Sequence, residues 1–286
     1  MNICVTGLGL LGGSFALGIK SKRKDVRITG VDISIENRAT AQRIGIADEP
    51  GEFESAVAKS DFVVIATPVS SVAELVRKAL DRIKESAVVI DLGSTKGLIC
   101  QEVAGHPRRG RYVAAHPIAG TENSGPESAF PTLLSHKMMI ICDREKSDPE
   151  ALRVTEEIFK DLEMKISYMA SAEHDRHIAW VSHLSHISSF ALGSTVLDKE
   201  KDERNIFNMA GSGFSSTVRL AKSSPDMWAP IFSQNSRNVS EALDAYIKKL
   251  QLFKKIIDEN DEISSHNLMK EANEIRRILT GILKSE

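Results

Sequence analysis

The chain has few of the features that mark several classes of protein. Only three of its 286 residues are cysteines, Cys4, Cys100 and Cys142, an odd number without a Cys-x-x-Cys spacing. This indicates buried thiols in a reducing compartment, so we expect a cytoplasmic protein. No apolar run reaches the length of about 18 residues that a membrane helix needs, and glycines interrupt the apolar N-terminus. We therefore expect neither a membrane span nor a targeting segment.

The sequence also lacks an excess of charge of one sign. Its 37 basic residues oppose 39 acidic ones, which gives a formal net charge of -2. This balance excludes the strong global field of a protein that binds nucleic acid or an anionic membrane. Two short basic clusters, at 20–24 and 108–111, are interpreted as solvated surface. No repeat, low-complexity tract or additional regulatory domain is recognisable, and the length suits two domains.

A glycine-rich motif begins at the first residues. A short apolar strand expected at 3–6 leads into Gly7-Leu8-Gly9-Leu10-Leu11-Gly12, the G-x-G-x-x-G pattern of a dinucleotide-binding turn. The first glycine permits a tight turn, the second leaves room for a pyrophosphate, and the third lets the next helix pack on its strand. Because the N-terminus of that helix carries the positive end of its dipole, we expect Gly7, Gly9, Leu10, Leu11 and Gly12 to bind the cofactor.

An acidic residue stands where such sites hold the adenosine ribose. A second apolar strand over 26–31 ends at Asp32, about 20 residues after Gly12, which is the spacing of the acid that accepts from the ribose hydroxyls. A carboxylate repels a 2′-phosphate, so Asp32 favours NAD over NADP, and the nearby Arg38 softens that preference. A plain surface turn with an ordinary aspartate is the less favoured interpretation.

Strand and helix patterns alternate as far as about residue 168. Apolar segments at 61–68, 87–91, 112–115, 137–142 and 165–168 indicate further strands, with helices at about 72–83 and 148–162. This order predicts an α/β fold, with a Rossmann-type doubly wound parallel sheet in a dinucleotide-binding domain over 1–169.

From residue 170 onward only helical periodicity is visible. It covers about 172–198, 225–258 and 262–283, which predicts an all-helical substrate-binding and dimerisation domain over 170–286. Its apolar stripes are too extensive for a helical unit of this size to bury alone, so we expect a homodimer formed through this region. The stripes include Met227, Ile231, Val239, Leu243 and Ile247.

Ligands of a doubly wound sheet bind beyond the carboxyl ends of its strands. Thr67 and Pro68 follow one predicted strand and are expected beside the cofactor. Ser94 follows the next, where its hydroxyl either reaches the nicotinamide or a neighbouring base, or caps a helix. His116 ends a further strand and is suited to accept the proton of an alcohol as hydride leaves its carbon. A structural histidine before Pro117 is the alternative.

The helical region adds two groups of polar side chains. Within residues 180–186, His183 and His186 are spaced i and i+3 on one helical face, which suits carboxylate binding. Glu173 and His177 on the same helix raise the alternative of a metal, but no acid cluster converges there and we expect no metal site. A glycine-rich break at 211–218 leads to Arg219. An arginine presented in this way suits bidentate capture of a carboxylate, and a surface ion pair is the plainer interpretation.

Taken in order, these motifs resemble those of the prephenate dehydrogenases, the tyrosine-pathway family that includes arogenate and cyclohexadienyl dehydrogenases. The resemblance covers essentially the whole chain, and the string from His116 to Glu122 is its most family-specific part. It implies a reaction of prephenate with NAD that gives 4-hydroxyphenylpyruvate, carbon dioxide and NADH, or the corresponding reaction of arogenate. The further matching segments are Asp91-x-x-Ser94-x-Lys96, Ser182-His183-Leu184-x-His186 and Gly213-Phe214.

The resemblance also implies roles for single residues. His116 binds the C4 hydroxyl and takes its proton, and Ser94 orients that histidine and the nicotinamide. Arg219 holds the ring carboxylate, and His186 lies near the side-chain carboxylate. We expect Glu122 to pair with Arg219 until substrate arrives. The remaining expected substrate-binding residues are Ser182, His183 and Trp228.

One departure and two alternatives stand beside this prediction. Ser215 and Ser216 occupy positions where family members often carry a basic residue and an aspartate, so ion pairs are not carried over to them. Another NAD enzyme with the same two domains, such as a hydroxy-acid dehydrogenase or an imine reductase, would not need the string from His116 to Glu122. A non-catalytic NAD-binding sensor would not need Ser94, His116 and Arg219 together.

Overall fold

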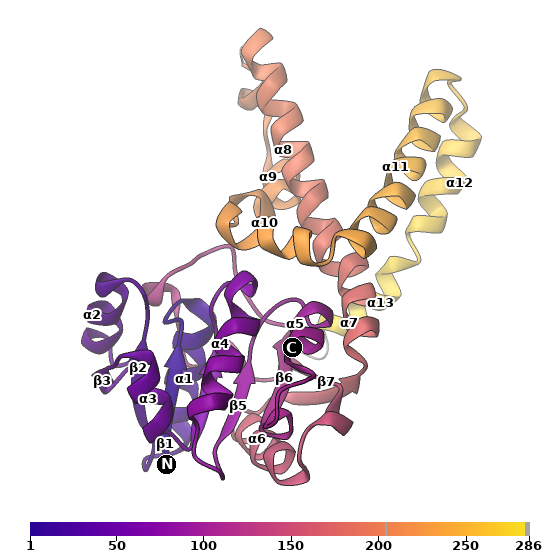
Figure 1. The fold of residues 1–286 in the computed structure, drawn as a ribbon. Coiled ribbons are helices and arrows are strands. Elements are labelled where there is room, and N and C mark those ends of the chain that lie inside the picture. Colours follow the sequence, from indigo (N-terminus) through magenta and orange to yellow (C-terminus); the bar gives the residue numbers. More distant parts are fainter. Residues whose placement is uncertain (204, 284–286) are drawn as a thin grey trace. The chain divides into compact units, whose positions relative to one another are not determined.

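The computed structural model describes residues 1–203 and 205–283 (Figure 1). The chain forms two compact units, Met1–Asn235 and Ser236–Glu286. The division expected at 169/170 stays a prediction, and helices that follow residue 170 contact helices of the preceding part. In particular, α7 (Ser171–Ile178) contacts α5 (Gly97–Val103).

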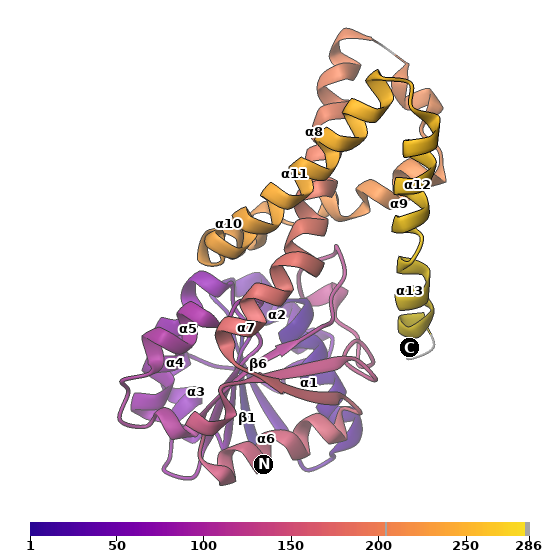
Figure 2. The same ribbon diagram turned by 90° about the vertical axis from the view of Figure 1, so that its right-hand side faces the viewer.

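The first unit is built on one eight-stranded sheet with the strand order β3-β2-β1-β4-β5-β6-β7-β8 (Figures 1 and 2). This order reverses between β1 and β4, which is the switch point where doubly wound sheets bind ligands. The strands are β1 (Asn2–Thr6), β2 (Arg27–Val31), β3 (Glu49–Pro50), β4 (Phe62–Ile65), β5 (Val88–Asp91), β6 (Tyr112–Pro117), β7 (Met138–Cys142) and β8 (Lys165–Met169).

The expected α/β architecture is confirmed with two corrections. The two-residue strand β3 was missed because it is too short to show an apolar pattern. The pair β6 and β7 is antiparallel, with His116 opposite Ile140, whereas a wholly parallel sheet was expected. The segment between these strands contains no α-helix among its residues, only a 3-10 turn at Pro126–Ser128. Without a crossover helix the chain returns along the sheet in the opposite direction.

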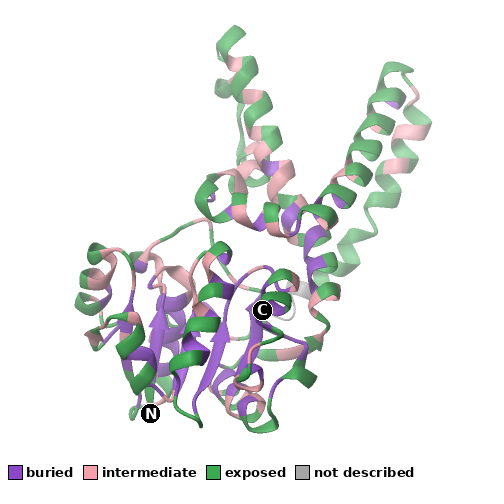
Figure 3. Ribbon diagram, viewed as in Figure 1, coloured by how far each residue is buried: buried purple, intermediate pink, exposed green. Residues whose placement is uncertain are grey.

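Helices cover both faces of the sheet. On one face α1 (Leu10–Lys22), α2 (Ile35–Arg43) and α6 (Pro149–Asp161) contribute side chains to one apolar cluster; on the other, α3 (Phe53–Lys59), α4 (Val69–Arg82) and α5 contribute to a second. The strands alternate between the two clusters, so that Ile3 and Val5 face the first and Cys4 the second. Strands buried on both faces explain the continuous apolar runs in the sequence (Figure 3).

The helical part differs in detail from the long helices expected. The segment after β8 is α7, a π-helical turn over Ala179–His183 and α8 (Leu184–Asp202). The expected break at 211–218 is a short helix, α9 (Ser212–Val218). The expected helix over 225–258 divides at Asn235 into α10 (Pro225–Gln234) and α11 (Ser236–Asp258), and the last divides into α12 (Glu262–Ala272) and α13 (Ile275–Leu283).

The break at Asn235 has a physical reason. Its buried side-chain amide donates a 2.7 Å hydrogen bond to the backbone oxygen of Asp175 and lies 3.3 Å from Nδ1 of His183. An asparagine that bonds elsewhere competes with helix continuation. Within residues 1–203 and 205–283, no helix has the length and hydropathy that a bilayer crossing requires.

Candidate active site

Two glycines of the first loop are required by close approach of the backbone. Gly7 has φ of +91°, and a Cβ atom there would lie 2.5 Å from the backbone oxygen of Ala66. A Cβ atom on Gly12 would lie 2.0 Å from the backbone oxygen of Gly7. A Cβ atom on Gly9 would meet nothing within 4 Å, so this position faces open space. The loop therefore has the shape that the sequence motif predicts, with its middle glycine turned outward.

The residues after β1 and β4 fit the phosphate end of a dinucleotide. Gly9 is the N-cap of α1 and supplies no side-chain hydrogen bond to the first turn. The N–H groups of Leu10 and Leu11 have no partner within an α-helix, which makes this end suited to an anion. Thr67 and Pro68 follow directly on Ala66, which packs against the glycine loop. The structure therefore brings these expected cofactor residues to one edge of the sheet.

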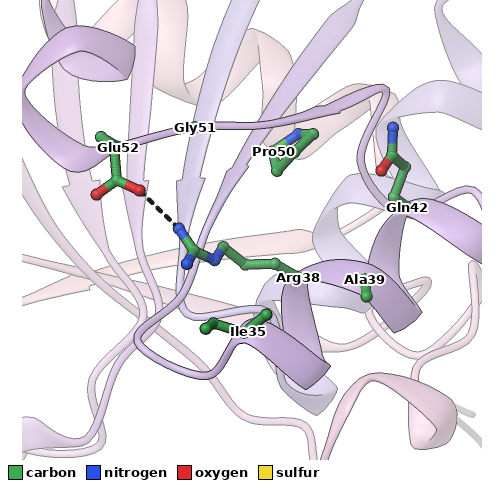
Figure 4. A pocket seen from close by; sticks show the side chains of 7 residues that line it. All are labelled: Ile35, Arg38, Ala39, Gln42, Pro50, Gly51 and Glu52. Carbon is green, nitrogen blue, oxygen red and sulfur yellow. Dashed lines mark hydrogen bonds and ion pairs between the residues drawn. The ribbon is translucent and has the colours of Figure 1, made fainter.

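Asp32 lies at the end of β2 and is already oriented by the backbone. One carboxylate oxygen accepts from the N–H of Leu8 and the other from the N–H of Ser34, both at 2.9 Å. On the following helix, Arg38 pairs with Glu52 at 2.8 Å in a pocket over α2 and the loop before α3 (Figure 4). Arg38, the cation expected to soften the preference against a 2′-phosphate, is thus paired with Glu52. The pocket is lined by Ile35, Arg38, Ala39, Gln42, Pro50, Gly51 and Glu52.

His116 is the penultimate residue of strand β6 and is 7% exposed. Its Nδ1 lies 2.8 Å from Nε2 of His174, and Nδ1 of His174 lies 2.8 Å from the carboxylate of Asp175. Burial lowers the pKa of His116 well below its ordinary value, and the nearby His174, Lys96 and His183 lower it further. His116 is therefore neutral near pH 7 and able to accept a proton.

The loop after β5 carries a buried ion pair rather than a contact between Ser94 and His116. Lys96 is fully buried, pairs with Asp91, and donates to the backbone oxygen of Ala115 at 2.8 Å. Ala115 directly precedes His116, so the ion pair fixes the strand end that presents the imidazole. Among the hydrogen bonds of the described residues, the partner of His116 is His174. The role of Ser94 beside the nicotinamide stays a prediction.

A second polar group gathers around Trp228. The ring of His186 stacks on the indole with centroids 3.6 Å apart, and the ring of His183 meets it edge-on at 5.8 Å. Burial lowers the pKa of His183 to about 4 and also lowers the pKa of His186. Ser182 contributes its backbone oxygen, which accepts from Nδ1 of His186 at 2.9 Å.

Two donors of this group point at no acceptor. The Asn235 amide donates to Nδ1 of His183, which places the hydrogen of the neutral ring on Nε2. Within the described residues, Nε2 of His183 and Nε1 of Trp228 are buried without a hydrogen-bond partner. Buried polar groups are almost always paired, so these two N–H groups indicate a site for an oxygen-bearing ligand.

Arg219 lies at the end of α9 and pairs with Glu122 at 2.7 Å. The ion pair expected between these residues is therefore present. A hydrogen bond from its own backbone N–H and the interaction with Arg219 lower the pKa of Glu122. Ser215 and Ser216 lie in the preceding helix, where the Ser216 hydroxyl donates to the backbone oxygen of Gly213 at 2.9 Å.

Sequence reasoning missed His174, which contacts the base, and Asp175, which contacts His174. His174 and Asp175 are 2% and 5% exposed, whereas the side chains of the neighbouring Glu173 and His177, which were considered as metal ligands, are 45% and 55% exposed. The available signal was the helical spacing in α7. His174 and Asp175 lie beside the buried Ile178 on its inner face, while Glu173 and His177 share the outer face.

Comparisons with known proteins agree with this geometry. Residues 15–168 match the family described as prephenate dehydrogenase, nucleotide-binding domain, and residues 170–271 match prephenate dehydrogenase, dimerization domain. A prephenate dehydrogenase of Bacillus subtilis is 30% identical over 281 residues, which cover 96% of this chain and 75% of that protein. A cyclohexadienyl dehydrogenase of Zymomonas mobilis is 27% identical, over 91% of this chain and 89% of that one.

Solved structures show the same relationship. A prephenate dehydrogenase of Aquifex aeolicus, in complex with hydroxyphenyl propionate and NAD+, superposes with a TM-score of 0.88 at 32% identity and covers 99% of this chain and 98% of its own. An arogenate dehydrogenase of Synechocystis superposes with a TM-score of 0.77 at 25% identity, over 98% of this chain and 100% of its own. The sequence, the fold and the arrangement of the site lead to one conclusion: this chain belongs to the prephenate dehydrogenase family.

Proposed function

We propose that this protein is an NAD-dependent prephenate dehydrogenase, which oxidatively decarboxylates prephenate to 4-hydroxyphenylpyruvate in tyrosine biosynthesis. The observation that carries the proposal is the buried, neutral His116 at the carboxyl end of β6. It lies in the sheet whose glycine loop has the shape of a dinucleotide site. Family membership and the NAD complex of the Aquifex aeolicus relative support the choice of reaction and cofactor.

The reaction combines a hydride transfer to the cofactor with a proton transfer to His116. Bound NAD supplies the acceptor for the hydride that leaves C4 of the substrate. His116 accepts the proton of the C4 hydroxyl at Nε2, because its Nδ1 is engaged by His174. Loss of carbon dioxide makes the ring aromatic, which renders the step effectively irreversible.

Three side chains are suited to the two carboxylates of prephenate. Arg219 holds the ring carboxylate after exchanging Glu122 for it. The unpartnered N–H groups of His183 and Trp228 donate to oxygen atoms of the pyruvyl side chain, with His186 beside them. These hydrogen bonds should contribute to the binding free energy, because a buried donor without an acceptor is energetically costly.

Arogenate is the alternative substrate. It differs from prephenate in carrying an amino group on the side chain. His186 is the residue that could contact this amino group. Its Nδ1 donates to the backbone, so the neutral ring has a lone pair on Nε2 that can accept a hydrogen bond from an ammonium group. Relatives named cyclohexadienyl and arogenate dehydrogenase are consistent with this alternative.

We further propose that the protein is a homodimer in the cytoplasm. The match of residues 170–271 to a dimerization domain supports the first part, as does the exposed apolar side of α11, where Ile247, Leu250 and Ile257 are 41%, 48% and 64% exposed. The three buried free thiols are consistent with a reducing compartment.

The test is NADH formation by the purified protein with NAD and prephenate, run beside arogenate and beside NADP. We expect turnover with prephenate and NAD. In His116→Asn, NAD affinity should persist while turnover falls on the order of 10²-fold or more, because the general base is lost. Binding of NAD without turnover of either substrate would refute the proposal and favour the sensor interpretation. Near-normal turnover by His116→Asn would remove this residue from its assigned role.

A further inference from the structure

A chain of three side chains runs from the base into the protein. His116 Nδ1 lies 2.8 Å from His174 Nε2, and His174 Nδ1 lies 2.8 Å from Asp175 Oδ1. All three side chains are less than 10% exposed. The far end is fixed by the backbone, because Oδ1 and Oδ2 of Asp175 accept from the N–H groups of Lys96 and Gly97 at 2.8 and 2.7 Å.

The carboxylate at the far end decides where each hydrogen lies. An ionised carboxylate only accepts, so Nδ1 of His174 carries a hydrogen. When the ring of His174 is neutral, its lone pair lies on Nε2 and accepts from Nδ1–H of His116. The hydrogen of neutral His116 is thus held on Nδ1, and its free lone pair is on Nε2.

Asp175 is well suited to the role of fixed acceptor. Burial alone would raise the pKa of this carboxyl group. The hydrogen bonds from His174 and from the N–H groups of Lys96 and Gly97 outweigh burial, and its pKa is lowered. Asp175 therefore stays ionised wherever the base is neutral.

We propose that His174 and Asp175 are positioning residues for the base, which hold His116 in the tautomer with its lone pair on Nε2 and share the charge that arrives there. When the hydroxyl proton bonds to Nε2 of His116, the Nδ1–H bond of His116 breaks and its proton passes to Nε2 of His174. The positive charge then rests on His174, next to the carboxylate of Asp175. This proposal deepens the proposed function, on which it rests for its substrate.

The surroundings make such charge sharing useful. The charged and titratable groups facing His116 are His174 from α7, Lys96 from the loop after β5, and His183 from the π-helical turn. The ammonium group of Lys96 and any proton on the two histidines oppose a positive charge on His116. Moving that charge to His174 places it farther along the chain and against an anion, which stabilises the protonated intermediate.

The first experiment reads the tautomers without using turnover. In a long-range ¹H–¹⁵N spectrum of protein labelled on its histidines, we expect both His116 and His174 as neutral rings with the hydrogen on Nδ1. The spectra of His116→Asn and His174→Gln assign the signals. A hydrogen on Nε2 of His116 would overturn the proposal, whatever the substrate of the enzyme.

The second experiment separates orientation from proton sharing. Glutamine in His174→Gln places an amide oxygen near the position of Nε2, so it accepts from His116 but takes up no proton. His174→Leu offers no acceptor. We expect kcat with prephenate to fall on the order of 10²-fold in His174→Leu and about tenfold in His174→Gln.

The control is His177→Gln, the same change on the solvent side of the same helix, where the ring is 55% exposed. It should leave kcat unchanged. NAD affinity should be unchanged in all three variants.

Equal losses in His174→Gln and His174→Leu, or near-normal turnover in His174→Leu, would refute the proposal. If His174→Leu does not fold, the tautomer of wild-type His116 and the rate of His174→Gln still decide it. Expected tautomers in a protein that turns over neither substrate would instead count against the proposed function.

Discussion

Removing Lys96 should destabilise the protein far more than removing an exposed lysine. The Lys96 side chain is fully buried, and its ammonium group pairs with Asp91 and donates to the backbone oxygen of Ala115. Asp91 also accepts from the Tyr112 hydroxyl at 2.6 Å and from the N–H of Gly93 at 2.9 Å. In Lys96→Met these two neutral donors remain, but the carboxylate is left buried without a counter-charge.

The size of the effect follows from the burial of the remaining charge. Breaking a buried pair by deleting one partner costs about 3–5 kcal/mol. For a chain of this length that corresponds to a fall in Tm on the order of 10 °C. Calorimetry and urea unfolding of Lys96→Met beside the wild type measure both quantities.

A matched control isolates burial from the loss of a lysine. Lys78 pairs with Glu74 at 2.6 Å on the surface of α4, with side chains 56% and 60% exposed. Lys78→Met should cost far less, because an exposed ion pair contributes little to stability. The double variant Lys96→Met/Asp91→Asn should recover part of the loss, because it removes the uncompensated charge. A loss in Lys96→Met no larger than in Lys78→Met would show that the buried charge is not the cause.

Two further outcomes are expected. Glu122→Gln releases Arg219 for the substrate, so the KM for prephenate should fall a few-fold and lose its dependence on pH. The control Glu127→Gln, which alters an exposed pair with Arg43, should change neither. An unchanged KM in Glu122→Gln would refute the exchange of Glu122 for the substrate carboxylate at Arg219. The pKa of His183 is about 6.5 in the unfolded chain and about 4 in the folded protein, so below pH 6.5 the unfolded state binds more protons and stability should fall on the order of 3 kcal/mol down to pH 4. Urea unfolding of His183→Gln at pH 7 and pH 5 should show a smaller loss than the wild type, and equal losses would contradict the assignment.

Much of the fold was predictable because its strands are buried on both faces. Short, continuous apolar runs such as 61–68 and 87–91 indicate strands that are buried on both faces. Their alternation with helical patterns predicts a doubly wound sheet. The edge strand β3 and the antiparallel pair were not predictable in this way. One is too short to have a pattern, and the other depends on the absence of a crossover helix.

The site was predictable where backbone geometry demands a residue type and not where contact depends on tertiary packing. Gly7 and Gly12 are recognisable because any side chain there would collide with the backbone. The partner of His116 comes from a helix 58 positions later; the helical spacing marks His174 as buried but does not reveal that it packs against His116. Asn235 is a similar case, since its amide breaks a helix in order to bond Asp175 and His183.

The hydrogen bond between His116 and His174 joins residues on opposite sides of the point where the two family domains meet, at 168 and 170. A chimaera that joined residues 1–169 to the helical part of an unrelated dehydrogenase would keep the imidazole but lose the side chains that hold it. If His174 and Asp175 position the base, recombination at this point should succeed only between chains that share the histidine and aspartate at the start of α7. In this chain the imidazole and the side chains proposed to position it therefore lie on both sides of the boundary, and engineered exchanges of the helical part should place their crossover after Asp175.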